Sequence, residues 1–387
     1  MPILNRAAEL QPEVAAWRRH LHENPELDFD VHQTGDFVAA KLAEFGADEI
    51  VRGIGRTGLV GVIRGRLGDG PTIGLRADMD ALPILEESGA PWTSKTPGKM
   101  HACGHDGHTA MLLGAAKYLA ETRNFAGSVA LIFQPAEESN GGGNEMVKDG
   151  MMERFSIGRV FGLHNAPGIP AGEFSTRTGG IMAGCADFRI LVTGKGGHAA
   201  YPHHAVDSVL VASQIVVALQ AIRSRNIDPI DSFVLSTTMI HGGDATNIIP
   251  QRVELQGTVR ALDPPVLKQV EERMRSVCDG VATSHGATAE VFYRYDYPVT
   301  VNHAAETELA CDVASEVAGE RRVNRDAPPE LGTEDFSYML EARPGAFMFI
   351  GNGDTPQCHH PAYDFNDEII PAGISYWVRL AETALKP

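Results

Sequence analysis

The densest group of side chains that could do chemistry lies at residues 100–108, where the sequence reads MHACGHDGH. Cys103 and His105 are separated by a single glycine, so in an extended or turning loop both could reach one ion. A thiolate and an imidazole together suit zinc or a neighbouring first-row metal. The alternative is a buried thiol beside polar histidines that cap a helix.

Other candidate ligands each follow a predicted strand: Glu137 and Glu138 after strand 128–133, His164 after strand 160–163, and His359 with His360 in the loop after strand 346–350. Taken singly, each has an ordinary explanation as a solvated acid or a satisfied polar histidine. Ligand sites gather at the carboxyl ends of the strands in open α/β sheets. Together these residues therefore predict one convergent site.

The adjacent pair Glu137 and Glu138 indicates a division of labour between two carboxylates. One can bind a metal while the other stays unligated and moves protons. Metal-assisted hydrolysis needs both roles, because the ion activates water and a free carboxylate carries the proton to the leaving group.

Two other classes of protein remain as alternatives. A hydrolase with Cys103 as nucleophile, paired with His105 or His108, would need no metal. A non-catalytic binding protein would hold a single structural metal, and its mark would be a missing base beside the ligands. The presence of Glu137 argues against this second class.

A glycine motif at residues 53–58, GIGRTG, fits the dinucleotide-binding spacing, with Asp78 about 20 residues further on. That motif must follow a strand and open a helix. Residues 59–63 are instead rich in β-branched side chains, so we interpret the motif as a turn that enters a strand.

The elements that must position these residues alternate in the first half of the chain: helix 34–45, strands 59–63 and 72–75, helix 109–121, strand 128–133 and strand 160–163. This rhythm predicts an α/β fold with an open, mostly parallel sheet. The pattern returns after residue 298 with helix 305–317, strand 346–350 and helix 372–385.

The middle of the chain has a different order: strand 188–192, helix 205–222, strand 233–240, strand 253–259, helix 265–283 and strand 289–293. This βαββαβ order predicts a ferredoxin-like unit. We therefore expect an inserted lid or dimerisation domain at 183–296, within a discontinuous catalytic domain at 1–182 plus 297–387.

Composition limits the possible partners. The chain has 387 residues and a formal net charge of −17, which repels nucleic acid and anionic lipid. The nearly apolar stretch 209–219 is too short to cross a bilayer and predicts a buried helix. Five widely spaced cysteines do not form a disulfide framework, and no secretory signal is visible, so we expect a cytoplasmic protein.

Ordered motifs along the chain resemble the bacterial hippurate hydrolase and plant indole-acetyl-amino-acid amidohydrolase group of the two-metal aminoacylase and carboxypeptidase family. They are RRHLH at 18–22, NPE at 24–26, RADMDALP at 76–83, HACGHDGH at 101–108, QPAEE at 134–138, GHA at 197–199, NIIP at 247–250, GTEDF at 332–336 and HHP at 359–361. The resemblance covers essentially the whole chain.

The resemblance implies two divalent metal ions, which could be zinc, manganese, cobalt or nickel. Their ligands would be Cys103, His105, Glu138, His164 and His359, with Cys103 between the ions. The family pattern His-x-Pro favours His359 over His360, although Cys358 stands where an apolar residue is usual. Glu137 would be the general base and acid.

Further roles follow from the same resemblance. Asp80 would orient a ligand, although Asp-Met-Asp also fits a turn or helix cap. His198 would stabilise the oxyanion, often from a partner subunit, or it is an exposed turn histidine. Asn247 and Arg260 would contact substrate, and a guanidinium can grip a carboxylate in a bidentate manner. A solvated strand end is the alternative for Arg260.

Several motif residues have no implied ligand role. Glu334 and Asp335 line the active-site rim in the family, or they form a solvated acidic turn. Glycines 141–143 fit a lid hinge or a tight loop. His22, His101, Asp106 and His108 are expected to pack or cap.

The expected activity is hydrolysis of an N-acyl amino acid to a carboxylic acid and a free amino acid. The alternative on the same scaffold is a dipeptidase or a carboxypeptidase. The acyl group stays open between benzoyl, acetyl and indole-acetyl. We expect a homodimer or homotetramer that associates through the inserted domain, and no nucleic-acid or membrane partner.

Overall fold

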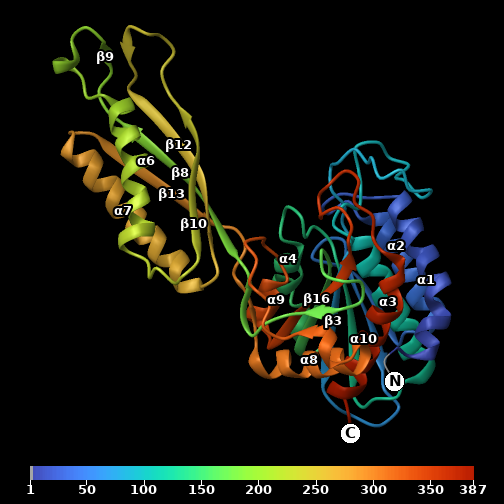
Figure 1. Ribbon diagram of the computed structural model, residues 1–387. Helices are drawn as coiled ribbons and strands as arrows, with labels where there is room; N and C mark the ends of the chain where they lie inside the picture. Colours follow the sequence, from blue (N-terminus) through green and yellow to red (C-terminus); the bar gives the residue numbers. More distant parts are fainter. Residues whose placement is uncertain (1–2) are drawn as a thin grey trace. The chain divides into compact units, whose positions relative to one another are not determined.

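The alternating strands and helices of the first half form the core of an eight-stranded sheet in the computed structural model, which describes residues 3–387 (Figure 1). The strand order is β1-β2-β4-β3-β5-β16-β6-β15. The four central strands β4, β3, β5 and β16 run parallel to one another, and the strands that flank them, β2 and β6, pair antiparallel with β4 and β16. The predicted α/β fold with an open, mostly parallel sheet is confirmed.

The strands of this part of the chain are β1 (Glu49–Ile54), β2 (Gly58–Arg64), β3 (Thr72–Asp78), β4 (Ser128–Gln134), β5 (Ile157–Pro167), β6 (Phe174–Ser175), β7 (Gly179–Met182), β14 (Thr300–Asn302), β15 (Val323–Asn324) and β16 (Gly345–Gly353). β4 is buried along nearly its whole length, as expected for a parallel strand covered on both faces.

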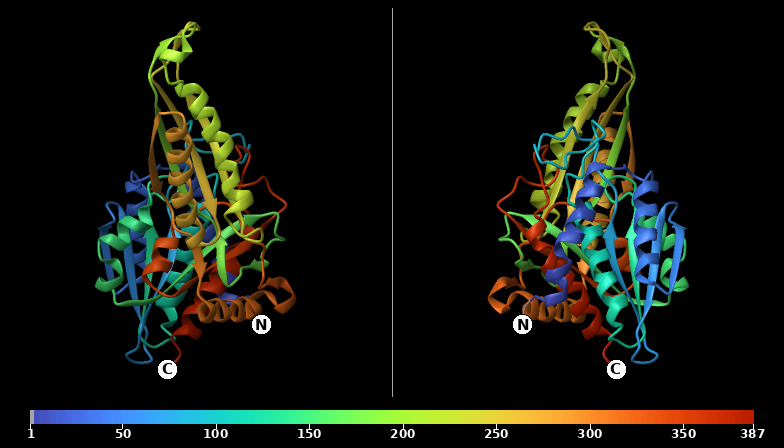
Figure 2. Two further views of the ribbon diagram at one scale, coloured as in Figure 1. Left: turned by 90° about the vertical axis from the view of Figure 1, so that its left-hand side faces the viewer. Right: turned by 90° about the vertical axis from the view of Figure 1, so that its right-hand side faces the viewer.

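The helices of this part are α1 (Asn5–Glu23), α2 (His32–Phe45), α3 (His105–Thr122), α4 (Gly142–Lys148), α5 (Met151–Arg154), α8 (Ala304–Ala318), α9 (Ser337–Ala342) and α10 (Ile370–Ala384), with short 3-10 helices η2 (Glu320–Arg322) and η3 (Asp367–Ile369). α1, α3 and α10 contact one another and lie side by side (Figure 2). Their apolar side chains join those of the sheet in one hydrophobic core.

The middle of the chain forms a separate antiparallel sheet in the order β10-β12-β8-β13, and α6 packs against α7 on it (Figure 2). Its elements are β8 (Gly184–Thr193), β9 (Gly197–His198), η1 (Pro202–His204), α6 (Ser208–Arg225), β10 (Phe233–His241), β11 (Ile248–Ile249), β12 (Arg252–Ala261), α7 (Pro264–Ser284) and β13 (Thr288–Tyr295). The main elements follow the predicted βαββαβ order, so the ferredoxin-like prediction is confirmed.

The chain divides into two units. The first comprises residues 3–181, Val301–Pro328 and Asp335–Pro387, and the second comprises Met182–Thr300 and Pro329–Glu334. The assignment of catalysis to the first unit, and of a lid or dimerisation role to the second, stays a prediction. Among the described helices, none is both long and apolar enough to cross a lipid bilayer.

The structure corrects two predicted helices. α3 begins at His105 and not at residue 109, so three chemically active side chains lie in its first turn. The stretch 209–219 is helical but not buried throughout, since Val209, Leu210 and Val217 are 43%, 49% and 73% exposed. The glycine motif at 53–58 forms the turn between the antiparallel strands β1 and β2, as we interpreted it.

Candidate active site

The carboxyl ends of the parallel strands bring the candidate ligands together. Asp78, the last residue of β3, pairs in register with Gln134, the last residue of β4. Glu137 and Glu138 follow in the next loop. His164 lies in β5, in register with Phe349 of β16. All six residues belong to the first unit.

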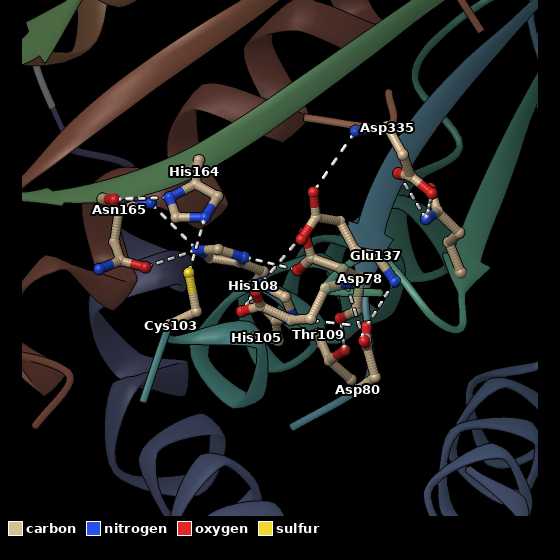
Figure 3. Close-up of polar contacts among 12 residues, drawn as sticks. Asp78, Asp80, Cys103, His105, His108, Thr109, Glu137, His164, Asn165 and Asp335 are labelled. Carbon is tan, nitrogen blue, oxygen red and sulfur yellow. Dashed lines mark hydrogen bonds and ion pairs between the residues drawn. The ribbon is translucent and has the colours of Figure 1, made fainter. Parts of the chain in front are cut away.

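The five predicted metal ligands lie within reach of one another. Cys103 Sγ lies 3.5 Å from His164 Nε2 (Figure 3). Glu138 Oε1 lies 3.7 Å from His105 Nε2, and Glu138 Oε2 lies 3.4 Å from His359 Nε2. In each of two triads, Cys103–His105–His164 and Cys103–Glu138–His359, the ligand atoms are within 4.8 Å of one another. Cys103 belongs to both triads.

The donor atoms of this cluster fit a cation. His105 is 1% exposed, yet neither ring nitrogen has a hydrogen-bond partner among the described residues, and the same is true of Glu138 Oε1. Buried polar atoms are nearly always satisfied. Divalent ions such as zinc take imidazole, thiolate and carboxylate ligands. A bound metal would therefore satisfy the atoms that the protein leaves unpaired.

The charges around the cluster also favour a cation. Hydrogen bonding to Cys358, burial and the nearby charge of Glu138 raise the pKa of Cys103 well above its usual value. Burial lowers the pKa of His105, but Asp78, Asp80 and Glu138 outweigh it and raise that pKa to about 10. These groups favour their protonated forms, and a divalent cation that binds here would displace protons from them.

Asp80 holds the backbone of the two glutamates. Its Oδ1 accepts the Glu137 N–H at 3.0 Å, and its Oδ2 accepts the Glu138 N–H at 3.1 Å (Figure 3). Asp80 Oδ1 also lies 3.5 Å from His105 Nδ1. Burial raises the pKa of Asp80, although the close contact with His105 and its charge oppose that shift. The contacts favour the orienting role over that of a turn or capping acid.

Glu137 is 6% exposed, so it is not the solvated surface acid that its sequence context allows. One of its carboxylate oxygens lies within 4.8 Å of the ligand atoms of His105 and Glu138. The Asp335 N–H donates to Glu137 Oε1 at 3.4 Å (Figure 3). A carboxylate beside the ligands, with an ordered donor on one oxygen, has the placement that a general base needs.

His359 and not His360 faces the cluster. Both histidines are exposed, but His359 Nε2 lies 3.4 Å from Glu138 Oε2, whereas His360 Nδ1 accepts a hydrogen bond from the Ala362 N–H at 3.0 Å. The hydrogen bond and charge of Glu138 raise the pKa of His359. This geometry favours His359 as the ligand, as the His-x-Pro pattern does.

Several residues around the cluster have roles that sequence reasoning missed. His108 bridges Asp78 and Asn165, with distances of 2.6 Å from Nδ1 to Asp78 Oδ1 and 2.6 Å from Nε2 to Asn165 Oδ1. Arg76 pairs with Asp78 at 2.7 Å and with Asp335 at 3.0 Å, both in the buried interior. An arginine within an apolar strand run was the signal for this buried pair.

The solvated-turn interpretation of Glu334 and Asp335 is wrong, because these residues are 2% and 0% exposed. The residues that cover these two acids lie far away in the sequence. The polar residues next to them in the sequence therefore indicated a solvent-exposed turn. Asp106 is also buried, and its Oδ2 lies 2.8 Å from His22 Nδ1. His101 is 2% exposed and its ring has no hydrogen-bond partner among the described residues. Neither residue is a surface helix cap.

The other predicted site residues lie in the second unit. His198 in β9 pairs with Ile248 in β11, and the Asn247 carbonyl accepts the Ala199 N–H at 3.0 Å. His198 and Asn247 therefore belong to one small ladder. Arg260 lies near the end of β12 and donates to the Val259 carbonyl at 3.1 Å. Their roles toward substrate stay predictions.

Comparisons with known proteins match the whole chain. A model of the family described as Peptidase family M20/M25/M40 matches residues 74–383. Hippurate hydrolase from Campylobacter jejuni is 42% identical over 386 residues, which cover 100% of both chains. Thermostable carboxypeptidase 2 from Saccharolobus solfataricus is 41% identical over 363 residues, which cover 92% of this chain and 90% of the relative.

A solved structure supports the same relationship. The Bacillus subtilis YXEP protein, described as a dinuclear metal binding peptidase from the M20 family, has a TM-score of 0.87 and 34% identity, with 98% of this chain and 99% of the other covered. The resemblance to the hippurate hydrolase group is thus confirmed. With relatives that match over nearly their full length, the chain belongs to peptidase family M20/M25/M40 and is a hydrolase that acts on amide bonds.

Proposed function

We propose that this protein hydrolyses the amide bond of N-acyl amino acids and releases a carboxylic acid and a free amino acid. The observation that carries the proposal is the cluster of Cys103, His105, Glu138, His164 and His359, with the buried Glu137 beside it. The full-length similarity to a hippurate hydrolase supports an N-acyl amino acid as substrate.

Two divalent metal ions would be held by the residues of the two triads, Cys103–His105–His164 and Cys103–Glu138–His359. The ring nitrogens of His105 and Glu138 Oε1, which lack hydrogen-bond partners among the described residues, support this occupancy. Zinc, manganese, cobalt and nickel all suit such donors. When bound, the metals would polarise the acyl carbonyl of the substrate and lower the pKa of water in the site.

Glu137 would move the proton in both halves of the reaction. Its carboxylate takes a proton from water as the water oxygen bonds to the acyl carbon. It then gives that proton to the amide nitrogen as the carbon–nitrogen bond breaks. Asp80 supports this role, because its carboxylate holds the Glu137 N–H and so fixes where the side chain starts.

His198 would stabilise the negative charge that develops on the acyl oxygen. Its Nδ1 accepts the Ala200 N–H at 3.1 Å, which places the proton of a neutral ring on Nε2. An Nε2–H group is the donor that an oxyanion needs. Asn247, in the same ladder, and Arg260 would contact the amino-acid part of the substrate.

A carboxypeptidase is the second candidate, since a thermostable carboxypeptidase is nearly as similar as the hippurate hydrolase. Both activities would use the same ligands and Glu137. Competition between hippurate and a dipeptide for one purified sample would separate them. Preference for the dipeptide in kcat/KM would favour the alternative of a dipeptidase or carboxypeptidase.

The role of Glu137 is tested with Glu137→Gln, which keeps the size of the side chain and removes its basicity. We expect normal folding and metal content, and a loss of kcat of at least about 100-fold for hippurate. Glu138→Gln is the matched comparison, because loss of a ligand should lower metal content as well as turnover. Retained turnover in Glu137→Gln would overturn the proposal.

The need for metal is tested by chelation of the purified protein, followed by addition of zinc, manganese, cobalt or nickel. We expect about two metals per chain, loss of hippurate hydrolysis on chelation, and recovery on addition. Metal-free protein with full activity that is abolished by alkylation would instead favour the Cys103 nucleophile. Such a nucleophile also conflicts with the raised pKa of the buried Cys103 thiol.

A further inference from the structure

We propose that Asp335 is the positioning residue for the general base Glu137; this inference rests on the proposed function. Asp335 is 0% exposed and donates its backbone N–H to Glu137 Oε1 at 3.4 Å (Figure 3). This contact orients one oxygen of the Glu137 carboxylate.

The Asp335 carboxylate is anchored by three different groups. Its two oxygens lie 2.7 and 2.8 Å from Gln134 Nε2, and Arg76 Nη2 donates to Oδ1 at 3.0 Å. The Gly143 N–H donates to Oδ2 at 2.8 Å. A buried carboxylate with several donors, one of them charged, has little freedom to move.

Two of these three donors lie at the two ends of the segment that carries Glu137. Gln134 is the last residue of β4, just before Glu137, and Gly143 lies at the start of α4, just after it. The Asp335 side chain thus ties both ends of the segment 134–143 to one carboxylate. The backbone N–H of Asp335 donates a hydrogen bond to Glu137, which lies inside that segment.

Arg76 supplies the positive charge that lies between two buried carboxylates. It lies in β3 and pairs with Asp78 at 2.7 Å as well as with Asp335. In Asp335→Asn, the NH2 group of the amide would face hydrogen-bond donors instead of an acceptor. The Arg76 guanidinium would also lose one of its two negatively charged partners. The expected result is a displaced Asp335 backbone and a misplaced Glu137, while the metal ligands stay in place.

The test is Asp335→Asn in the metal-loaded full chain, with hippurate as substrate. We expect kcat to fall about 10- to 100-fold, with KM within about three-fold of the wild type and metal content unchanged. A displacement of about 1 Å at a reacting group lowers the rate by up to about 100-fold. A residue with a merely structural role would lose metal and folded protein in proportion to activity.

Asn302→Ala is the matched control. Asn302 is 2% exposed, and its side chain makes hydrogen bonds to Thr176, Arg177 and Phe347 in the same unit. We expect this variant to lower the melting temperature without a comparable loss of kcat. Equal loss of kcat in both variants at equal melting temperature would overturn the positioning role.

Gly143→Ala is the second variant, in case Asp335→Asn does not fold. A Cβ at Gly143 would lie 3.0 Å from the Asp335 carbonyl oxygen and 3.2 Å from its Cγ, so it pushes on Asp335 directly. We expect lower kcat with unchanged metal content. A kcat within about three-fold of the wild type in a folded variant of either kind would overturn the inference.

The double variant Glu137→Gln with Asp335→Asn separates this inference from the proposed function. If Asp335 acts through Glu137, the double variant is no slower than Glu137→Gln alone. A further loss would overturn the inference and leave the proposed function intact. Full turnover in Glu137→Gln by itself would instead overturn the proposed function.

Discussion

At the scale of single residues, partners decide what two similar side chains do. Burial raises the pKa of both Asp78 and Asp80, but His105, Arg76 and His108 surround Asp78 and bring its pKa well below the usual value. Asp78 is therefore a fixed negative charge that holds His108. Asp80 instead accepts the backbone N–H groups of the two glutamates.

The His22 imidazole should make the stability of the protein depend on pH. Burial lowers the pKa of His22 and Arg18 opposes its charge, but Asp106 and Glu86 raise that pKa to about 9. The folded state therefore holds a proton that the unfolded state releases near pH 6.5. This stabilisation is complete below about pH 6.5 and is lost as the pH rises to about 9.

We expect His22→Gln to lower the free energy of unfolding most at pH 6, and to differ little from the wild type above pH 9. The difference should change by at most about 1.4 kcal/mol per pH unit, as one proton requires. Urea unfolding at constant, saturating metal measures it. His32→Gln, at a side chain that is 70% exposed, is the control. A difference that does not change with pH would contradict this account.

At the scale of elements, the start of α3 decides how the metal ligands are presented. Gly104 precedes the helix with a φ of +90°, and the turn lets Cys103 and His105 share one cluster. A Cβ at Gly104 would lie 2.2 Å from Asn165 Oδ1 and 2.5 Å from the Tyr363 hydroxyl. Both the backbone conformation and the close approach therefore require glycine.

Gly104→Ala should combine backbone strain with a steric clash, and so lower the free energy of unfolding by about 2 to 5 kcal/mol. It should also weaken metal binding. Gly98→Ala is a matched control, because Gly98 has a φ of +82° with nothing within 4 Å of its Cβ position. That variant should cost only about 1 to 2 kcal/mol, with metal affinity unchanged. Equal effects in both, by denaturation and metal titration, would rule out the clash.

At the scale of the whole molecule, the second unit exposes large apolar side chains on neighbouring elements in sequence. Val209, Leu210 and Val217 of α6 are 43%, 49% and 73% exposed, and Met239 and Ile240 of the edge strand β10 are 47% and 57% exposed. Groups of large, exposed apolar side chains mark surfaces through which proteins associate with one another. They support the prediction that a second copy of the chain associates through this unit.

Val217→Asp should weaken that association, because it places a charge in the apolar surface of α6. We expect sedimentation to shift toward the mass of one chain, 41.6 kDa, at concentrations where the wild type is an oligomer. Arg273→Asp adds an acid to an exposed position of α7 and serves as the control. An oligomer of unchanged strength in Val217→Asp would exclude this face.

Much of the fold could be predicted from local patterns. The two kinds of sheet, the βαββαβ order and the loop that carries Glu137 and Glu138 follow from apolar periodicity and turn residues. The prediction that His164 follows its strand was wrong, because β5 continues to Pro167 and holds His164 within it. Short strands such as β6, β9 and β15 could not be predicted, because two residues carry no period and depend on a partner strand. The first turn of α3 could not be predicted either, because its polar side chains lack the apolar spacing that indicates a helix.

The sequence by itself determined which donor atoms are available and that Glu137 and Glu138 follow a strand of a parallel sheet, because residue type and apolar spacing are local properties. Only the tertiary structure decided that Asp335 is buried against Arg76, 259 residues away, and that His359 faces Glu138 while His360 faces solvent. The physical reason is that burial, hydrogen-bond partners and charge come from other segments, which meet only when the chain has folded.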